Sequence, residues 1–390
     1  MIESGTHPWL AQQRVHYGQA AGPLLQKECE RSGAKRVFVT TTRSLTDRAY
    51  VAGCIEALGS RFVGKFDAIA AHSPREAVIE GASRIRDAQA DLVVAIGGGS
   101  VIDATKVMLQ AVWFGIDTAA GLDAIVGGKH AGGVDPSAWD ADPQSLRMIA
   151  VPTTLSAAEF SHAAGVTDVA NRVKQSYAHP MAVPKVVILD PAATLDTPME
   201  LLLSTGMRSM DHAVERWCAT RALPLPDALS LHAMNMLARC LPRTKAAPDD
   251  LAARADCQVA MWLSLLPQTA GVPFGASHGI GYILGGAYNV PHGVTSCLAL
   301  PAVLQWNEPV NAERQKAVAE ALGRPGERAG VAMREFVRDL GVPWRLRDLG
   351  FERSTLGEIA ARYDGSGPIA TNPRPVKSAA DIVEILELAW

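Results

Sequence analysis

The chain lacks a strong charge of either sign and any long apolar run. Its 390 residues carry 37 Lys and Arg against 40 Asp and Glu, a formal net charge of −3, which gives no reason to expect a nucleic-acid or membrane partner. No apolar run is long enough to cross a bilayer. The opening residues, MIESGTHPWLAQQ, show neither the basic start nor the apolar core of a secretory signal.

Cysteine is also scarce. The 6 cysteines are scattered and form no C-x-x-C pair, and a chain of this length needs no disulfides to hold a core together. The simple interpretation is reduced thiols in a cytoplasmic enzyme. The length itself indicates two domains.

The most informative stretch is LVVAIGGGSVIDATK, from Leu92 to Lys106. Its short apolar run predicts a buried strand, the glycine triplet breaks that strand, and the residues from Ser100 onward favour a helix. Glycines without Cβ atoms, followed by the free N–H groups of a helix, suit the phosphates of a dinucleotide. The triplet is not the G-x-G-x-x-G fingerprint, and tight glycine turns without ligands are about as common.

The first half of the chain alternates strands with helices. The pattern predicts strands over 36–40, 62–69, 92–96, 147–151 and 186–190, and helices over 22–33, 43–58, 74–90 and 100–113. Such alternation predicts an α/β fold with a doubly wound parallel sheet, whose ligands gather at the carboxyl ends of the strands. The segment from Gly115 to Ser145, rich in Gly, Ala and Asp, is either a surface insertion or a lid over the site.

Two further features of this half attract attention. Thr153 and Thr154 follow a strand, where their hydroxyls can bind a nicotinamide or a phosphate, although a Thr-Thr pair is usually only a turn. Lys174 lies in a polar hairpin. Without a functional role it would be an ordinary solvated surface charge.

The second half is helical throughout, with Pro and Gly turns and no convincing strand. We therefore expect an α/β domain over residues 1–195 and an all-α domain over residues 196–390. In the second domain Arg208 and His212 are four residues apart, as are His278 and Tyr282, and each pair shares a helix face. With His292, the histidines either converge on a metal from two helices or serve as separate core and surface residues.

At these motifs the chain resembles the iron-containing alcohol dehydrogenase family, which shares its fold with dehydroquinate synthase. GGGSVIDATK, VPTT and GASHGIGYILGGAYNVPHG match the family's cofactor, threonine and histidine motifs. Within the family the likeness is greatest to the maleylacetate reductases of aromatic-compound catabolism, through RVHYG, PTTLSAAE, VPKVVILDP, GMRSMDHAVE and NPRPVKSAADIVEILELAW. The resemblance covers nearly the whole chain apart from residues 115–145.

The resemblance implies roles for particular residues. The positions that correspond to nicotinamide-cofactor contacts in the family are Gly97, Gly98, Gly99, Ser100, Asp103, Thr153, Thr154 and Lys174. His212, His278 and His292 correspond to three of the four metal ligands of the metal-dependent members. The fourth ligand is an Asp, and its place is taken by Arg208, which cannot donate a lone pair.

Two neighbouring residues bear on this departure. Asp211 points about 100° around the helix from His212 and is a poor substitute ligand. Tyr282 stands where both branches of the family usually have a histidine, and a phenol is a weaker acid than an imidazolium. Tyr282 either donates a proton or is a packing residue.

These observations lead to three hypotheses. The first is a metal-independent NAD(P)H-dependent reductase of a small keto acid such as maleylacetate, with Arg208 and protonated histidines stabilising the developing alkoxide beside Tyr282. The second is a metal-dependent alcohol dehydrogenase that uses iron or zinc. The third is a family member that has lost redox function and acts either as a non-redox enzyme on a related acid or as a nucleotide-binding protein. The residues that follow the strand over 36–40 are Thr41-Thr42-Arg43, and none of them is an acid that would repel the 2′-phosphate of NADPH. The sequence therefore permits NADPH and does not exclude NADH. The resemblance also favours a homodimer.

Overall fold

The computed structural model describes residue 7 and residues 9–70, 73–128, 146–169, 171, 173–221 and 223–390. Within the Gly115 to Ser145 segment only residues 115–128 are described, and they include the 3-10 turn Ala120–Ile125. The rest of that segment, on which the insertion and lid interpretations depend, lies outside the described residues. Among the described residues, no helix has both the length and the apolar character needed to span a membrane.

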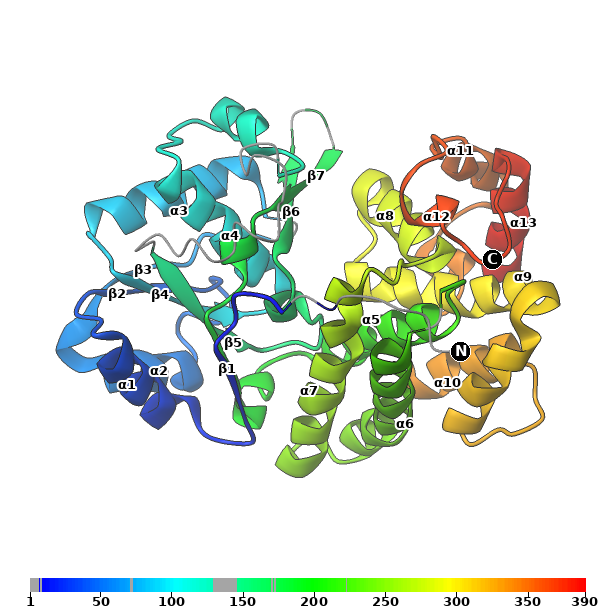
Figure 1. Ribbon diagram of the computed structural model, residues 1–390, viewed down its shortest axis with the longest axis horizontal. Helices are drawn as coiled ribbons and strands as arrows, with labels where there is room; N and C mark the ends of the chain where they lie inside the picture. The colour runs from blue at the N-terminus through cyan, green and yellow to red at the C-terminus, as the bar shows by residue number, and fades with distance from the viewer. Residues whose placement is uncertain are drawn as a thin grey trace. The chain divides into compact units, whose positions relative to one another are not determined.

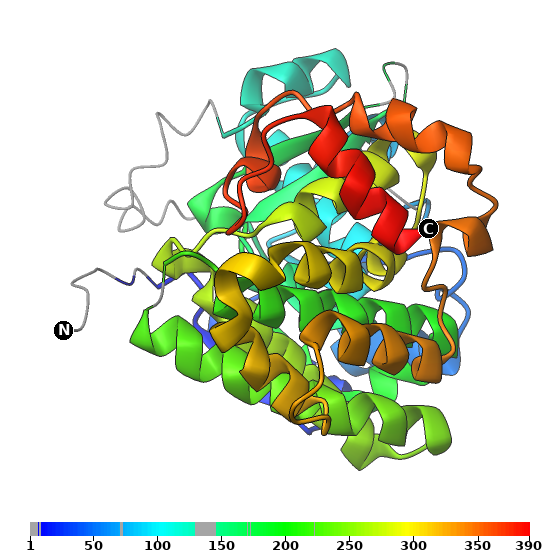
Figure 2. The ribbon, with the colours of Figure 1, turned by 90° about the vertical axis from the view of Figure 1, so that its right-hand side faces the viewer.

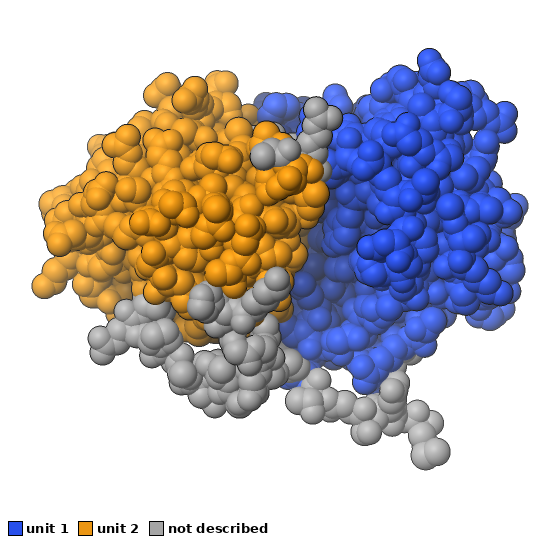
Figure 3. Space-filling view, turned by 90° about the horizontal axis from the view of Figure 1, so that it is seen from above, with its two compact units in different colours: residues 1–7, 198–390 blue, residues 8–197 orange. Residues whose placement is uncertain are grey.

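The chain divides into two compact units, Pro8–Thr197 and Pro198–Trp390, the second of which includes residues 1–7 (Figure 3). The first unit contains a parallel sheet of 6 strands in the order β1-β8-β5-β4-β2-β3. Its strands are β1 Arg14–Tyr17, β2 Val37–Thr40, β3 Phe62–Phe66, β4 Leu92–Gly97, β5 Arg147–Pro152 and β8 Val186–Leu189. The doubly wound parallel sheet predicted from the alternating pattern is confirmed.

Helices cover both faces of this sheet (Figure 1). They are α1 Ala21–Ser32, α2 Ala49–Leu58, α3 Arg75–Asp87 and α4 Gly99–Trp113. Successive strand residues point to opposite faces, so Val94 packs with α1 and α2 while Val93 packs with α3 and α4. A strand buried on both faces needs a continuous apolar sequence, which explains LVVAIG in β4.

Two predicted boundaries differ from the structure. Helix α2 begins at Ala49 rather than at Arg43, because the N–H groups of Leu45 and Thr46 donate to the carbonyl of Thr42 and form turns instead. Strand β3 ends at Phe66 rather than at Ile69. The polar hairpin expected around Lys174 is present as a separate antiparallel pair, β6 Ala163–Asp168 and β7 Val173–Ala178.

The second unit is helical. Its helices are α5 Met199–Trp217, α6 Pro224–Ala246, α7 Leu251–Leu265, α8 Ala276–Tyr288, α9 His292–Ala321, α10 Ala329–Leu340, α11 Leu356–Ala360, α12 Gly367–Ala370 and α13 Ala379–Ala389. No strand occurs over residues 198–221 and 223–390. Helix α13, red in Figure 2, contributes Ile382 and Leu386 to the same apolar core as Ile280 of α8 and Leu298 of α9.

Candidate active site

The glycine triplet lies at the carboxyl end of the central strand β4. Gly97 is the last residue of β4, Gly98 is the N-cap of α4, and Gly99 is its first residue. The strand, turn and helix predicted from the sequence are therefore present, and the positive end of the α4 dipole lies at the turn. This arrangement suits an anionic group such as a pyrophosphate.

The threonine loop packs directly on this turn. The N–H of Thr153 donates to the carbonyl of Gly97 at 3.0 Å. A Cβ atom at Gly98 would lie 2.8 Å from Thr154 Cγ2, and one at Gly99 would lie 2.8 Å from Ser156 Oγ. The glycines are thus required by the close approach of their own chain as well as by room for a ligand.

Of the three remaining predicted cofactor residues, Ser100 lies in the first turn of α4, and Asp103 and Lys174 both contact Gly165 in β6. Asp103 Oδ2 accepts the N–H of Gly165 at 3.0 Å. A Cβ at Gly165 would come within 2.2 Å of Lys174 Cε, so the lysine side chain crosses over this glycine. The first unit therefore holds all eight predicted cofactor residues on β4, α4, the threonine loop and the hairpin that packs on α4.

A second group of predicted residues meets inside the helical unit. The rings of His212 on α5 and His278 on α8 are 5.1 Å apart, and Tyr282 meets His278 edge to face at 6.4 Å. Tyr282 in turn stacks on His292, the first residue of α9, at 6.0 Å. The guanidinium carbon of Arg208 lies 5.8 Å from the Tyr282 ring centroid. The five residues expected to be catalytic form one continuous cluster.

Exposure differs sharply across this cluster. Tyr282 is 47% exposed, whereas Arg208 is 3% exposed and His278 is fully buried. A long cationic side chain is rarely buried unless another group compensates its charge. The half-exposed tyrosine therefore forms the accessible side of the cluster, and the arginine lies behind it.

Glu215 organises the cluster, although the sequence analysis did not identify it. Its carboxylate accepts the N–H groups of Gly275 at 2.8 Å and Ser277 at 2.7 Å, at the start of α8. It also accepts Nδ1–H of His278 at 2.7 Å. This carboxylate caps α8 from another helix and orients the His278 ring, with Nε2 directed elsewhere. The four-residue spacing from Asp211 was the only sequence signal for it.

Asp211 lies much closer to the cluster than its position on the helix suggested. It is fully buried, and its Oδ2 lies 3.5 Å from His278 Nδ1 and 3.6 Å from Arg208 Nη1. The angle around α5 does separate Asp211 from His212, but α8 and α9 pack against both sides of that helix. Tertiary packing therefore places Asp211 within the cluster, although the geometry of α5 alone predicted that it would point away from His212.

Comparison with known proteins now identifies the scaffold. The model described as iron-containing alcohol dehydrogenase matches residues 12–191, and that of the Fe-containing alcohol dehydrogenase family, C-terminal, matches residues 202–390. The chain belongs to the iron-containing alcohol dehydrogenase family. It is accordingly an NAD(P)-dependent oxidoreductase, with the dehydroquinate synthase-like fold expected from its motifs.

Relatives are similar over nearly their whole lengths. A maleylacetate reductase from Burkholderia cepacia is 30% identical, covering 97% of this chain and 95% of the relative. An NAD-dependent methanol dehydrogenase from Bacillus methanolicus is 29% identical, covering 80% of each. The crystal structure of an iron-containing alcohol dehydrogenase from Corynebacterium glutamicum has a TM-score of 0.81 at 25% identity, covering 100% of this chain and 97% of that one.

The family implies a divalent metal, and the residues of this chain fit one poorly. In the described part of the chain, the ligand atoms of Asp211, Glu215 and His278 lie within 4.8 Å of one another, and no other such group occurs. The Glu215 oxygens already accept N–H groups, and Asp211 Oδ2 accepts the hydroxyls of Ser277 and Ser296. The Arg208 guanidinium beside them repels a cation.

The three histidines do not replace that group. They come from three helices, α5, α8 and α9, rather than the two expected. His212, His278 and His292 do not bring their ligand atoms within 4.8 Å of one another in the described structure. Nothing in this donor set compensates for the carboxylate that Arg208 replaces.

The expectation of protonated histidines is wrong for two of the three. Burial, reinforced by the Arg208 guanidinium, lowers the pKa of His212 and His278 well below the usual value. Both rings are therefore neutral near pH 7. Among the described residues, His212 Nδ1 and His278 Nε2 have no hydrogen-bond partner. The fixed positive charge of the cluster resides on Arg208.

A buried acid–base pair lies beneath the cofactor loop. Lys106 Nζ donates to the carbonyls of Ala158 and Ala163, each at 2.7 Å, and lies 3.3 Å from Asp103 Oδ1. The Glu159 carboxyl is fully buried nearby, and neither of its oxygens has a partner among the described residues. Burial raises the pKa of Glu159 to about 8 and lowers the pKa of Lys106.

We expect Glu159→Gln to flatten the dependence of stability on pH. The folded state holds the Glu159 proton up to about pH 8, whereas the unfolded chain releases it near pH 4.5. The free energy of unfolding of the wild type therefore falls as pH rises through this window, and the variant lacks that decline. At pH 9 the variant should be more stable by at least about 1 kcal/mol, measured by urea unfolding.

The matched control is Glu313→Gln, because the Glu313 side chain is 85% exposed on α9. It should follow the wild-type pH profile. Parallel profiles for wild type and Glu159→Gln would show that Glu159 ionises at its ordinary pKa.

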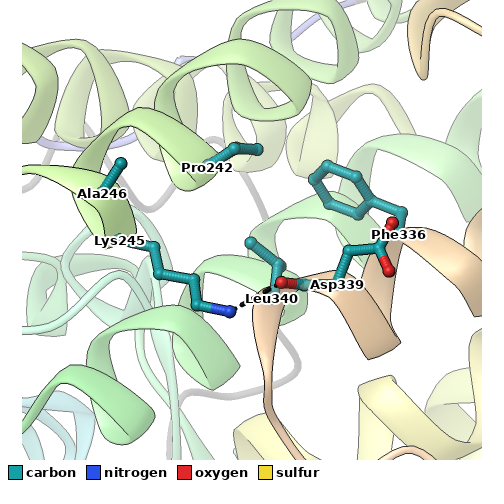
Figure 4. Close-up of a pocket in the computed structure, with 6 residues that line it drawn as sticks. All are labelled: Pro242, Lys245, Ala246, Phe336, Asp339 and Leu340. Atoms are coloured by element: carbon teal, nitrogen blue, oxygen red, sulfur yellow. Dashed lines mark hydrogen bonds between the residues drawn. The ribbon is translucent and has the colours of Figure 1, made fainter.

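A cavity in the helical unit has no part in this cluster. It has a volume of about 280 Å³ and lies on α6 and α10 (Figure 4). Its lining is mainly apolar, and Lys245 Nζ donates to the Asp339 carbonyl at 2.7 Å. None of the predicted site residues lines it.

Proposed function

We propose that this protein is an NAD(P)H-dependent reductase of a small keto acid such as maleylacetate, which it converts to 3-oxoadipate without a catalytic metal. The observation that carries the proposal is Arg208, a buried guanidinium where metal-dependent members have a carboxylate ligand. The similarity to maleylacetate reductases over almost the whole chain supports the substrate class.

Arg208 suits a carboxylate substrate for a geometric reason. A guanidinium presents a rigid fork of donors that matches two carboxylate oxygens. Its Nη1 donates to Ser296 Oγ at 3.1 Å, and its Nε has no partner among the described residues. At least the Nε–H donor of Arg208 is therefore not committed to a partner within the described part of the chain.

The reaction requires two functions of this cluster, which are the stabilisation of negative charge and the donation of a proton. When bound, the reduced nicotinamide would supply a hydride to the C=C bond that is conjugated with the ketone of maleylacetate, and the electron pair of that bond would move onto the carbonyl oxygen as an enolate. Arg208 stabilises that charge, because a preorganised cation in a water-poor site acts strongly on a developing anion. The phenol of Tyr282 supplies a proton to the carbon next to the carbonyl, which restores the ketone and gives 3-oxoadipate, and the phenolate regains its proton from solvent. Neutral His278, held by Glu215, packs against the tyrosine and limits its orientation.

The cofactor cradle accepts either nicotinamide cofactor. After β2 the chain continues as Thr41-Thr42-Arg43, without the acidic side chain that would bind a ribose 2′-hydroxyl and repel a 2′-phosphate. Arg43 is exposed there. We expect turnover with both NADH and NADPH.

Removal of metal should leave the activity unchanged. Protein dialysed against a chelator, with its iron and zinc contents measured, is tested for NADH and NADPH oxidation with maleylacetate, and 3-oxoadipate is quantified. We expect one product molecule per cofactor oxidised, because the charge that a metal would supply is part of the chain. Loss of activity on stripping, restored by Fe²⁺ or Zn²⁺, would contradict metal independence. Cofactor binding without oxidation of the cofactor would instead point to non-redox chemistry.

A further inference from the structure

A buried carboxylate lies behind Arg208 and takes no part in the reaction described above. Asp211 is fully buried on α5, and its Oδ2 accepts two hydroxyl protons, from Ser277 at 2.9 Å and from Ser296 at 2.6 Å. Ser277 belongs to α8 and Ser296 to α9. Side chains of three helices therefore meet at one oxygen atom.

The Ser296 hydroxyl links Arg208 to Asp211 through two successive hydrogen bonds. Arg208 Nη1 donates to Ser296 Oγ at 3.1 Å, so the single proton of that hydroxyl is free to point at Asp211. The same carboxylate oxygen lies 3.6 Å from Arg208 Nη1. The guanidinium is thus fixed at one edge, both by a relayed hydrogen bond and by direct attraction.

Arg208 also faces the ring of Tyr282, which is nearly half exposed, and Arg208 Nε has no partner among the described residues. The charge of Arg208 is therefore compensated on the buried side and available on the accessible side. An anion that approaches past Tyr282 meets a cation whose field is partly cancelled from behind.

We infer that Asp211 is an internal counter-ion that positions Arg208 and limits its affinity for carboxylates. The inference rests on the proposed function, in which Arg208 binds the substrate carboxylate. Asp211 is a positioning residue, because it acts through Arg208 and does not touch the substrate. Arg208 holds a fixed positive charge where metal-dependent relatives use an ion, and Asp211 keeps the attraction of that charge moderate enough for an anionic product to leave.

Four proteins test this inference: the wild type, Asp211→Asn, Arg208→Ala and the double variant. The probe is malonate, a dicarboxylate with neither a ketone nor a reducible double bond, and its dissociation constant is measured by calorimetry at pH 8. The amide oxygen of Asn still accepts both serine hydroxyls, so the substitution removes mainly the charge. We expect Asp211→Asn to tighten malonate binding on the order of tenfold and to have no effect in the Arg208→Ala background.

The matched control is Asp227→Asn, which removes the same charge from an ion pair with Arg314 and should leave malonate affinity unchanged. If Arg208→Ala abolishes malonate binding while Asp211→Asn binds it as the wild type does, the counter-ion role is overturned and the carboxylate-binding role survives. A merely structural role would change the affinity equally in both backgrounds, which also overturns it.

Urea unfolding of the same four proteins provides a second measurement that needs no ligand. A counter-ion and its cation must show a coupling free energy in the double-mutant cycle. If malonate binds no better to wild type than to Arg208→Ala, the proposed substrate class fails, and unfolding still decides whether Asp211 and Arg208 are coupled. Additive effects on unfolding would overturn the pairing.

Discussion

Arg208→Ala is expected to lower kcat/KM for maleylacetate by about 10³-fold. The substitution removes both the fork that binds the carboxylate and the cation that stabilises the developing oxyanion, so kcat and KM should both worsen. Stopped-flow and steady-state oxidation of NADH provide the two constants. Cofactor affinity should not change, because the glycine and threonine residues that cradle it belong to the other unit of the chain.

Two further variants separate the charge of Arg208 from its shape and from the fold. Arg208→Lys keeps a cation but loses the planar fork, and its loss of kcat/KM should be intermediate. Arg208→Ala leaves Asp211 as a buried charge without its counter-ion, which is itself destabilising. The double variant with Asp211→Asn removes that charge, so it should recover stability without recovering activity. Wild-type turnover by a folded Arg208→Ala protein would refute the mechanism.

Gly98→Ala is expected to weaken the binding of NADH and NADPH by about 10²-fold. The added methyl group would lie 2.8 Å from Thr154 Cγ2, so either the threonine loop or the start of α4 must move. Both are parts of the turn that we expect to receive the pyrophosphate. Fluorescence titration of the reduced cofactor measures the loss directly, without any substrate.

The control for this variant is Gly53→Ala on α2, because a Cβ atom there meets nothing within 4 Å. It adds the same methyl group to the same unit and should stabilise the helix slightly. Cofactor binding should be unaffected. Equal cofactor affinity of Gly98→Ala and Gly53→Ala would show that the turn after β4 does not hold the pyrophosphate.

Local patterns were sufficient to predict the fold. The alternation of apolar strands with amphipathic helices up to Asp190 predicted the parallel sheet, since strands buried on both faces must be continuously apolar. The start of α2 was misplaced because Thr42 to Arg48 have acceptable helix propensity, whereas turns on the Thr42 carbonyl take those N–H groups. Propensity does not include such competing hydrogen bonds.

The candidate site was predicted in part for a similar reason. Spacing of four residues places Arg208 with His212 and His278 with Tyr282, because this depends only on helix geometry. The roles of Asp211 and Glu215 depend on how α8 and α9 pack against α5, and their partners lie at residues 275–278 and 296. No local pattern encodes those long-range contacts. The neutral state of His278 likewise follows from burial, which the sequence shows only indirectly.

Arg208 is covalently part of the chain, and this affects what fraction of the protein carries the positive charge in a cell. A divalent ion exchanges with its surroundings, so the active fraction of a metalloenzyme depends on the supply of that ion and on competition from other metals. The guanidinium of Arg208, in contrast, is present in every folded copy. Under the proposed metal-free mechanism, the fraction of molecules that carry this positive charge equals the folded fraction, and we expect scarcity of iron or its oxidation in air to leave that fraction unchanged.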